Sequence, residues 1–162
     1  MDVRVTLEDI DEENWREVAM LTTEEDHLPK VCEKFVPGNA LSICQAFFED
    51  TWTVRVAYCG HRPMGFVMYG YCEEYDFYEL ARLMIDVRHQ GKGFGSIVLG
   101  LAIEEIMELE ECESLYIRMN PENIRAKHIY EKAGFVDSGK MAGNEAVYVL
   151  DLAKYREAEE VD

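Results

Sequence analysis

The segment 88–96 carries three glycines at alternate positions, Gly91, Gly93 and Gly95, between a strand-like and a helix-like pattern. Glycine lets the backbone turn tightly and lets a ligand approach the main chain closely. The first N–H groups of a helix lack intrahelical partners and, with the helix dipole, attract anions. Residues 88–96, called the glycine loop below, are therefore a candidate phosphate site. A glycine-rich turn without a ligand is the alternative that the loop alone leaves open.

Two common nucleotide-binding patterns do not fit the glycine loop. A P-loop requires Ser or Thr after its lysine, whereas Lys92 is followed by Gly93. A dinucleotide-binding fingerprint has the spacing GxGxxG and an acidic residue at the end of the next strand. Here the spacing is GxGxG, and the next expected strand ends at Arg118 and Met119. A phosphate ligand of this loop would belong to another class.

The glycine loop and a second segment resemble the same family. Gln90-x-x-Gly93-x-Gly95 resembles the acyl-CoA pyrophosphate loop of the GNAT superfamily of N-acetyltransferases. Residues 120–135 resemble the N-x-x-A-x-x-x-Y-x-x-x-G-F block of that superfamily, through Asn123, Ala126, Tyr130, Gly134 and Phe135. Further segments are similar to bacterial spermine/spermidine acetyltransferases: 13–15, 35–46, 65–69 and 79–86.

This resemblance implies a fold, a co-substrate and a reaction. The fold is α/β, with a mixed, mostly antiparallel central sheet flanked by helices and a splayed strand pair at the acetyl-CoA site. The co-substrate is acetyl-CoA, with no metal. The reaction is direct attack of a small polyamine's primary amine on the thioester. Another amine as acceptor (an amino acid, an aminosugar antibiotic or a protein N-terminus) and a non-catalytic acyl-CoA-binding module remain alternatives.

Two residues are implied as catalytic. Acetyl transfer needs a proton taken from the ammonium and a proton given to the leaving thiolate. Glu79 stands eleven residues before Gln90, where family members with a glutamate base carry it. Tyr130 stands where the family places a tyrosine near the coenzyme sulfur. An exposed strand glutamate, a water chain as the base and a tyrosine packed on the core are the alternatives.

The resemblance also implies coenzyme contacts. These residues are Met84, Ile85, Val87, Gln90, Gly91, Lys92, Gly93, Phe94, Gly95, Ser96, Asn123 and Lys132. The strand residues among them would contribute backbone groups, with an N–H near Ile85 polarising the thioester carbonyl. Asn123 would hydrogen-bond the pantetheine arm or a phosphate.

Acidic residues near these motifs suit a multiply charged amine. Glu73, Glu74 and Asp76 precede the expected strand that carries Glu79, and Glu33 lies in the segment where the family builds its acceptor site. We expect these four to bind the substrate. Ordinary surface acidity is the alternative, because an exposed ion pair contributes only ~0.2–1 kcal/mol.

Hydrophobic periodicity predicts the elements that position these residues. Strands are expected at 3–7, 52–59, 63–71, 78–87, 114–119, 136–141 and 146–152. Helices are expected at 12–21, 39–48, about 93–109 and 121–133, with a short helix within 22–37. Arg82 and Asp86 are charges on an otherwise apolar strand, so we expect them to form pairs or caps.

The composition limits the possible partners. The chain has 162 residues, 16 Lys+Arg and 33 Asp+Glu, giving a net charge of −17, which disfavours nucleic acid and anionic membranes. We expect a single domain over 1–162, with a frayed acidic tail at 157–162. Five scattered cysteines and a start without signal-peptide character predict reduced thiols and a cytoplasmic protein. A homodimer is possible by analogy with the family.

Overall fold

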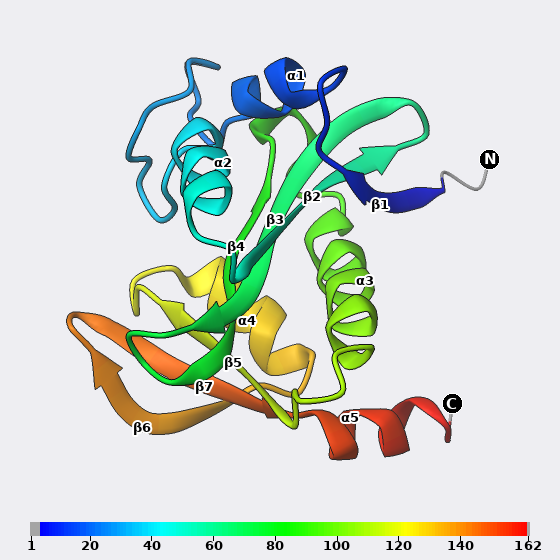
Figure 1. Ribbon diagram of the computed structural model, residues 1–162, viewed down its shortest axis with the longest axis vertical. Helices are drawn as coiled ribbons and strands as arrows, with labels where there is room; N and C mark the ends of the chain where they lie inside the picture. The colour runs from blue at the N-terminus through cyan, green and yellow to red at the C-terminus, as the bar shows by residue number, and fades with distance from the viewer. Residues whose placement is uncertain (1–3, 162) are drawn as a thin grey trace.

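The computed structural model describes residues 4–161, which form one seven-stranded sheet with helices on both faces (Figure 1). The strand order is β1-β2-β3-β4-β5-β7-β6, and only the pair β4 and β5 is parallel. This is the mixed, mostly antiparallel sheet that the family resemblance implied. The strands are β1 (Val5–Asp9), β2 (Trp52–Cys59), β3 (Arg62–Cys72), β4 (Phe77–Ile85), β5 (Ser114–Met119), β6 (Val136–Ala142) and β7 (Glu145–Asp151).

The helices follow the expected pattern with several corrections. They are α1 (Trp15–Met20), α2 (Asn39–Phe48), the 3-10 helix η1 (Val87–His89), α3 (Phe94–Met107), α4 (Ile124–Lys132) and α5 (Leu152–Glu159). The predicted bounds of α2, β2 and β5 are confirmed. No helix among residues 4–161 is long and apolar enough to cross a membrane.

Four predictions about the helices and the C-terminal tail are wrong. α1 begins at Trp15 rather than at residue 12. Residues 22–37 form no helix; this segment makes turns and an isolated bridge between Cys32 and Pro37. α4 begins at Ile124 rather than at Pro121, because the Asn123 side chain caps it by accepting a hydrogen bond from the Ala126 N–H. Residues 157–159 belong to α5 instead of a frayed tail. Asp162 lies outside the described residues.

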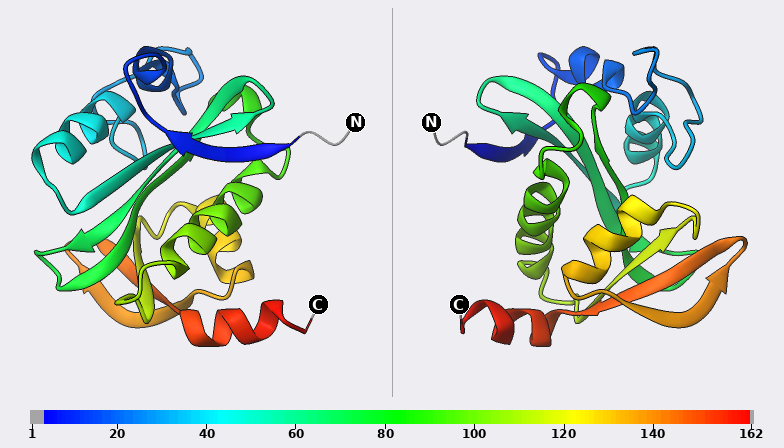
Figure 2. Two further views of the ribbon diagram at one scale, coloured as in Figure 1. Left: turned by 45° about the vertical axis from the view of Figure 1, so that its right-hand side comes forward. Right: turned by 180° about the vertical axis from the view of Figure 1, so that it is seen from behind.

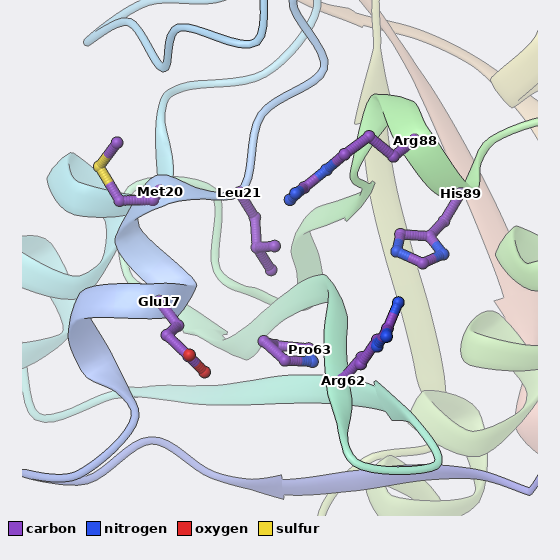
Figure 3. A pocket seen from close by; sticks show the side chains of 7 residues that line it. All are labelled: Glu17, Met20, Leu21, Arg62, Pro63, Arg88 and His89. Atoms are coloured by element: carbon purple, nitrogen blue, oxygen red, sulfur yellow. The ribbon is translucent and has the colours of Figure 1, made fainter.

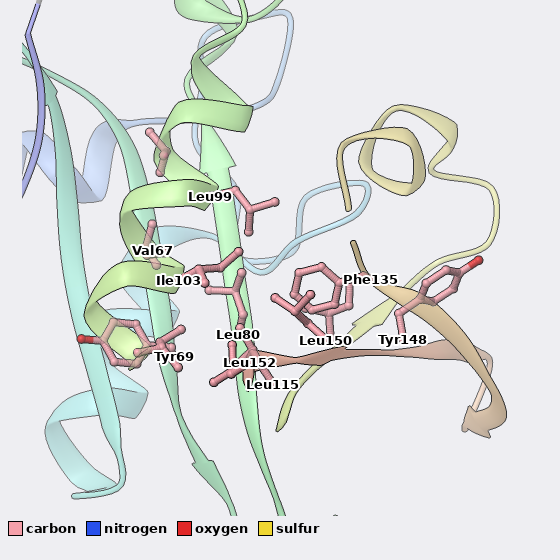
Figure 4. Close-up of a cluster of buried hydrophobic side chains, with 14 of the residues drawn as sticks. Val67, Tyr69, Leu80, Leu99, Ile103, Leu115, Phe135, Tyr148, Leu150 and Leu152 are labelled. Atoms are coloured by element: carbon pink, nitrogen blue, oxygen red, sulfur yellow. The ribbon is translucent and has the colours of Figure 1, made fainter. Parts of the chain in front are cut away.

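Two hydrophobic clusters lie on opposite faces of the sheet. The larger contains Leu99 and Ile103 of α3, packed against Val67 and Leu80 of the sheet and extending to Phe135 (Figure 4). The smaller lies under α1 and α2 and includes, among others, Val18, Phe66 and Met84. Burial of apolar surface against both faces stabilises the sheet by about 25 cal/mol per Å². Figure 2 shows α3 (green) on one face of the sheet and α2 (cyan) on the other.

The central strands β4 and β5 are paired at only two positions. Tyr78 lies opposite Leu115 and Glu79 opposite Tyr116, and beyond them the strands diverge. We call Glu79 and Tyr116 the fork, and the space between 80–85 and 117–119 the split. The splayed strand pair implied by the family resemblance is therefore present. β4 also bulges at Ala81, because Met68 pairs with Arg82 whereas Tyr69 pairs with Leu80.

Candidate functional site

The glycine loop leads from the end of β4 to the N-terminus of α3. Gly91 and Gly93 have φ angles of 74° and 83°, in the left-handed region that favours glycine, and Gly93 is the N-cap of α3. A Cβ atom at either position would meet no atom within 4 Å. Their backbone therefore faces open space, as a loop that binds a phosphate through N–H groups requires. Ser96, in the first turn of α3, is exposed, and Phe94 is half-buried.

Side chains of the glycine loop brace it against its neighbours. The Gln90 side-chain N–H donates to the Ile85 carbonyl at 2.9 Å, and its side-chain oxygen accepts from Arg125 of α4 at 3.0 Å. Lys92 Nζ donates to the Arg88 carbonyl at 3.1 Å. Gln90 thus ties the end of β4 to α4, a role that the sequence motif alone does not reveal.

Asp86 connects the start of the glycine loop to the segment 22–37. Its buried carboxylate caps η1, pairs with Arg88 Nε at 2.7 Å and accepts from the Thr22 N–H at 3.0 Å. Burial favours the neutral acid, but the Arg88 side chain and the N–H groups of Thr22 and Arg88 outweigh it, so the pKa of Asp86 is lowered. The expected pairing and capping are confirmed.

Three strand residues expected at the coenzyme have other contacts as well. The Val87 N–H donates to the Thr22 carbonyl at 2.8 Å, so this donor is already used, and Val87 lies in η1 rather than in β4. The Met84 side chain packs in the smaller cluster. The Ile85 carbonyl is the acceptor for Gln90.

Glu79 lies at the fork and is almost fully buried, at 1% exposure. Arg118 of β5 reaches it from the far side of the split, with Nε 2.7 Å from Oε1 and Nη2 3.4 Å from Oε2. Arg118 also approaches Glu145 at 3.4 Å and lies over the ring of Tyr75, 4.8 Å from its centroid. Glu79 is therefore not the exposed strand glutamate of the alternative reading.

Tyr130 lies on the opposite face of the sheet from Glu79. It packs against the larger cluster, edge-on to Phe135 at 5.5 Å, whereas Glu79 points to the other side, since its neighbour Leu80 belongs to that cluster. Burial raises the pKa of Tyr130 to about 12, so the phenol keeps its proton at neutral pH. Within residues 4–161 its hydroxyl makes no hydrogen bond. The two candidate catalytic residues therefore lie on opposite sides of the sheet, Glu79 on β4 and Tyr130 on the helix α4.

Arg82 is a charged side chain without a carboxylate partner among the described residues. Its Nη1 donates to the Ala81 carbonyl at 2.9 Å, and Nη2 lies 3.5 Å from the Gln45 side-chain oxygen. Its Nε is buried and has no hydrogen-bond partner in the described part of the chain. Burial lowers the pKa of Arg82. The expected pair or cap is absent here.

The four acidic residues expected at the substrate do not converge on one place. Glu73 and Glu74 are exposed in the turn between β3 and β4, and Asp76 of that turn accepts a hydrogen bond from the Tyr71 hydroxyl. The segment 22–37, which holds Glu33, lies beside α1 and α2, at the other end of α2 from that turn (Figures 1 and 2). Glu33 accepts from Thr22 Oγ1 at 2.6 Å and from the Thr23 N–H at 2.9 Å. It therefore orders its own segment.

Asn123 and Lys132 lie at the two ends of α4. The Asn123 side-chain oxygen caps the helix, 3.2 Å from the Ala126 N–H, and this bond uses the group that we expected to contact the coenzyme. Lys132 is exposed in the last turn. Asparagine is among the preferred N-cap residues, so the sequence contained a signal for this second role.

A cavity of about 600 Å³ lies beside η1, between α1 and the start of β3 (Figure 3). Arg62, Arg88 and His89 lie around it, with Leu21 and Pro63 as apolar wall. Burial lowers the pKa of His89. Neither Glu79 nor Tyr130 lines this cavity, so the candidate chemistry lies elsewhere. Residues 4–161 contain no group of His, Cys, Asp or Glu arranged to hold a metal ion.

Comparison with known proteins gives consistent matches. The model of the acetyltransferase (GNAT) family matches residues 7–135. A spermine/spermidine N(1)-acetyltransferase of Bacillus subtilis is 38% identical over 96 residues, 55% of this chain and 63% of that protein. The alignment thus spans less than two thirds of this relative's length.

Solved structures share the fold at low sequence identity. The spermidine N-acetyltransferase of Vibrio cholerae, in complex with CoA and spermine, has a TM-score of 0.70 at 20% identity, covering 94% of this chain and 98% of that one. An aminoglycoside acetyltransferase in complex with coenzyme A has a TM-score of 0.78 at 17% identity, covering 96% and 99%.

The contacts of Asp86 predict a pH-dependent stability. Asp86→Asn should lower the free energy of unfolding at pH 7 by about 1–3 kcal/mol, because Arg88 loses its buried charged partner. The lowered pKa means that the carboxylate stabilises the fold above about pH 4 and ceases to do so as the pH falls through the folded-state value. In urea unfolding, the difference in the free energy of unfolding between the wild-type protein and Asp86→Asn should therefore become smaller below about pH 4. Asp50→Asn, at an exposed turn, is the control; a pH-independent difference for Asp86→Asn would contradict the assignment.

Proposed function

Because the chain belongs to the acetyltransferase (GNAT) family, we propose that it transfers the acetyl group of acetyl-CoA to a primary amine of a small polyamine such as spermidine or spermine. The observation that carries the proposal is the parting of β4 and β5 at the fork, with Glu79 buried at the fork and the glycine loop at the other end of β4. This arrangement provides one site for a thioester and one for a phosphate along a single strand.

The described residues fit acetyl-CoA. The open backbone at Gly91 and Gly93, at the N-terminus of the 14-residue helix α3, suits the pyrophosphate. The edge of β4 beyond Glu79 has no pairing with β5, so its backbone groups are available to an extended arm. Acetyl-CoA, when bound, supplies an activated acyl group. Gln90, Lys92 and Arg125 shape and charge the entrance to this site.

In the proposed reaction the amine nitrogen attacks the thioester carbonyl carbon, and the carbon–sulfur bond breaks. Glu79 accepts one proton of the ammonium, directly or through water, and Tyr130 donates a proton to the thiolate. The nitrogen then loses its second proton, which restores the Tyr130 phenol, so the products are the acetamide, the free thiol of CoA and the proton held by Glu79. The raised pKa of Tyr130 keeps the phenol protonated at neutral pH, and it also makes the phenol a weaker acid than a tyrosine in water. Their placement on the two faces of the sheet lets the amine and the coenzyme approach the split from opposite sides.

An acyl-enzyme on cysteine has little support. Burial raises the pKa of Cys112 to about 11, and burial also raises the pKa of Cys72, so both thiols are poor nucleophiles at neutral pH. All five cysteines are free. Direct attack by the amine is the simpler route.

A polyamine is favoured as acceptor by charge and by the relatives. The net charge of −17 attracts polycations, and Glu73 and Glu74 are exposed in the turn that precedes β4 and Glu79. The Bacillus subtilis relative is a spermine/spermidine acetyltransferase by name, and the Vibrio cholerae structure holds spermine. In this proposal the segment 22–37 contributes to the acceptor site, and Glu33 orders that segment by accepting hydrogen bonds from Thr22 and Thr23.

A second acceptor class is favoured by Arg82. Its buried Nε has no partner within the described residues, and burying an unpaired charge is costly. A carboxylate on the acceptor would supply that partner. An amino acid is thus the alternative acceptor.

We also propose that the protein forms a homodimer in the cytoplasm. β6 forms an outer edge of the sheet and exposes Val136 and Met141, so pairing of two copies there would give a homodimer. The free cysteines suit a reducing cytoplasm. The acidic surface disfavours nucleic acid and anionic membranes as partners.

The first functional prediction concerns the glycine loop. Gly93→Val places a β-branched residue at a φ of 83°, which distorts the N–H groups at the start of α3. We expect the Kd for acetyl-CoA to rise about 10–100-fold, as for the loss of a hydrogen bond to a charged group. Calorimetry would measure this, with Gly100→Val in the same helix as the matched control. Equal Kd values for acetyl-CoA in the two variants would show that the glycine loop does not bind the coenzyme.

The second concerns Tyr130. Tyr130→Phe removes the hydroxyl and keeps the ring packed against Phe135. If the phenol protonates the thiolate, kcat should fall ~10²–10⁴-fold while acetyl-CoA affinity stays unchanged. Release of free CoA with spermidine as acceptor measures kcat. A kcat within threefold of the wild-type value would leave Tyr130 a packing residue only.

The third concerns the acceptor. We expect kcat/KM to rise from monoamine to diamine to spermidine, and this advantage to shrink as salt screens the charges over a Debye length of about 8 Å. The triple variant Glu73→Gln, Glu74→Gln, Asp76→Asn should reduce the differences in kcat/KM among the three amines. A variant with Glu157, Glu159 and Glu160 changed to Gln has the same net charge and should leave these differences unchanged.

Matched acceptors separate the two candidate classes. Lysine and 1,5-diaminopentane differ by one carboxylate, so a preference for lysine that Arg82→Gln abolishes would replace the polyamine with an amino acid. Binding of acetyl-CoA without product from any amine would indicate a non-catalytic module.

A further inference from the structure

Arg118 is the only side chain among the described residues that forms an ion pair across the split. It stands on β5 two positions beyond the last residue that pairs with β4, and its guanidinium reaches back to the Glu79 carboxylate with two donors. A planar guanidinium that binds both oxygens of a carboxylate fixes the orientation of that carboxylate as well as its place.

The same guanidinium is held from two further elements. Glu145, at the start of β7, lies 3.4 Å from Nη1, and the ring of Tyr75 lies beneath it. Tyr75 stacks on Phe77 at 5.7 Å, and Phe77 stacks on Tyr116 of the fork at 4.5 Å. The Arg118 side chain is 21% exposed, so these contacts leave it little freedom. Burial alone would lower the pKa of Arg118, but its bond to Glu79 and the charges of Glu79 and Glu145 leave it raised.

We propose that Arg118 is a positioning residue for acetyl transfer, which orients the Glu79 carboxylate at the fork so that it meets the acceptor amine. This rests on the proposed function and on Glu79 as the base. Other groups near Glu79 do not replace it: the buried thiol of Cys72 carries no charge, and Arg82 bonds instead to the Ala81 carbonyl. Arg118 itself need not touch the substrate.

A double-mutant cycle on kcat tests this role. Glu79→Gln should lower kcat ~10²–10⁴-fold, and Arg118→Met about 10–100-fold, with KM for acetyl-CoA unchanged in both. If Arg118 acts through Glu79, the double variant should be no slower than Glu79→Gln alone, because residues that act as a unit are not additive. Additive losses would overturn the proposal.

Matched variants separate positioning from stability. Arg55 also pairs with a carboxylate, with Nε 3.0 Å from Glu105 and a side chain 27% exposed, away from the split. Arg55→Met should leave kcat unchanged, both in the wild-type protein and in the Glu79→Gln background. Arg118→Lys retains the charge and should recover part of the kcat lost in Arg118→Met.

A folding defect in Arg118→Met can be distinguished from the loss of its role in acetyl transfer. If Arg118→Met does not fold because Glu79 is left unpaired, the Lys variant and the double variant, which removes both charges, complete the comparison. No acetyl transfer by the wild-type protein to any amine would overturn the proposed function itself. Acetyl transfer by the wild-type protein, with kcat unchanged in Arg118→Met or with a double variant slower than Glu79→Gln alone, would overturn only the role of Arg118.

Discussion

The candidate site depends on the short parallel pairing of β4 with β5, which covers only two residues of each strand. A parallel pair that ends after Tyr78 and Glu79 leaves backbone groups of the central strand without a partner, whereas the other neighbouring strands are paired along most of their length. Unpaired backbone groups are costly when buried away from water. Flanking elements hold the opening in place. On one face the first turn of α3 approaches α4, where a Cβ at Gly95 would lie 3.3 Å from Ile129. On the other face Arg118 of β5 pairs with Glu79 of β4.

A second set of contacts centres on the buried carboxylate of Asp86. Asp86 is bonded to Thr22 on one side and to Arg88 on the other, and Thr22 is bonded in turn to Glu33. The segment 22–37 is therefore anchored to the residues that precede the glycine loop. These anchors are short polar bonds at a buried position, so their geometry is well defined although the segment has no helix or strand of its own.

The sequence predicted the elements better than the partners within the site. Periodicity located α2, β2 and β5 to the residue, and the motif spacing located the glycine loop between β4 and α3. α5 was missed because its acidic residues resemble a solvated tail, although Asp151 is an N-cap that accepts from the Lys154 N–H. The partner of Glu79 was not predictable, because Arg118 lies 39 residues away and meets it only through the register of β4 and β5. The sequence also did not predict that the side-chain oxygens of Asn123 and Glu33 accept hydrogen bonds from nearby backbone N–H groups, those of Ala126 and Thr23.

The lack of regular structure in the segment 22–37 has a consequence for how this protein evolves. The segment contributes no strand to the sheet, and Thr22, Thr23 and Glu33 account for much of its polar anchoring. Insertions and substitutions between these anchors would leave the sheet register and the glycine loop unaltered, since exposed loops tolerate change far better than packed elements do. Under the proposed function, selection for a new acceptor would therefore act on a stretch of chain whose variation carries little penalty for folding or for the glycine loop.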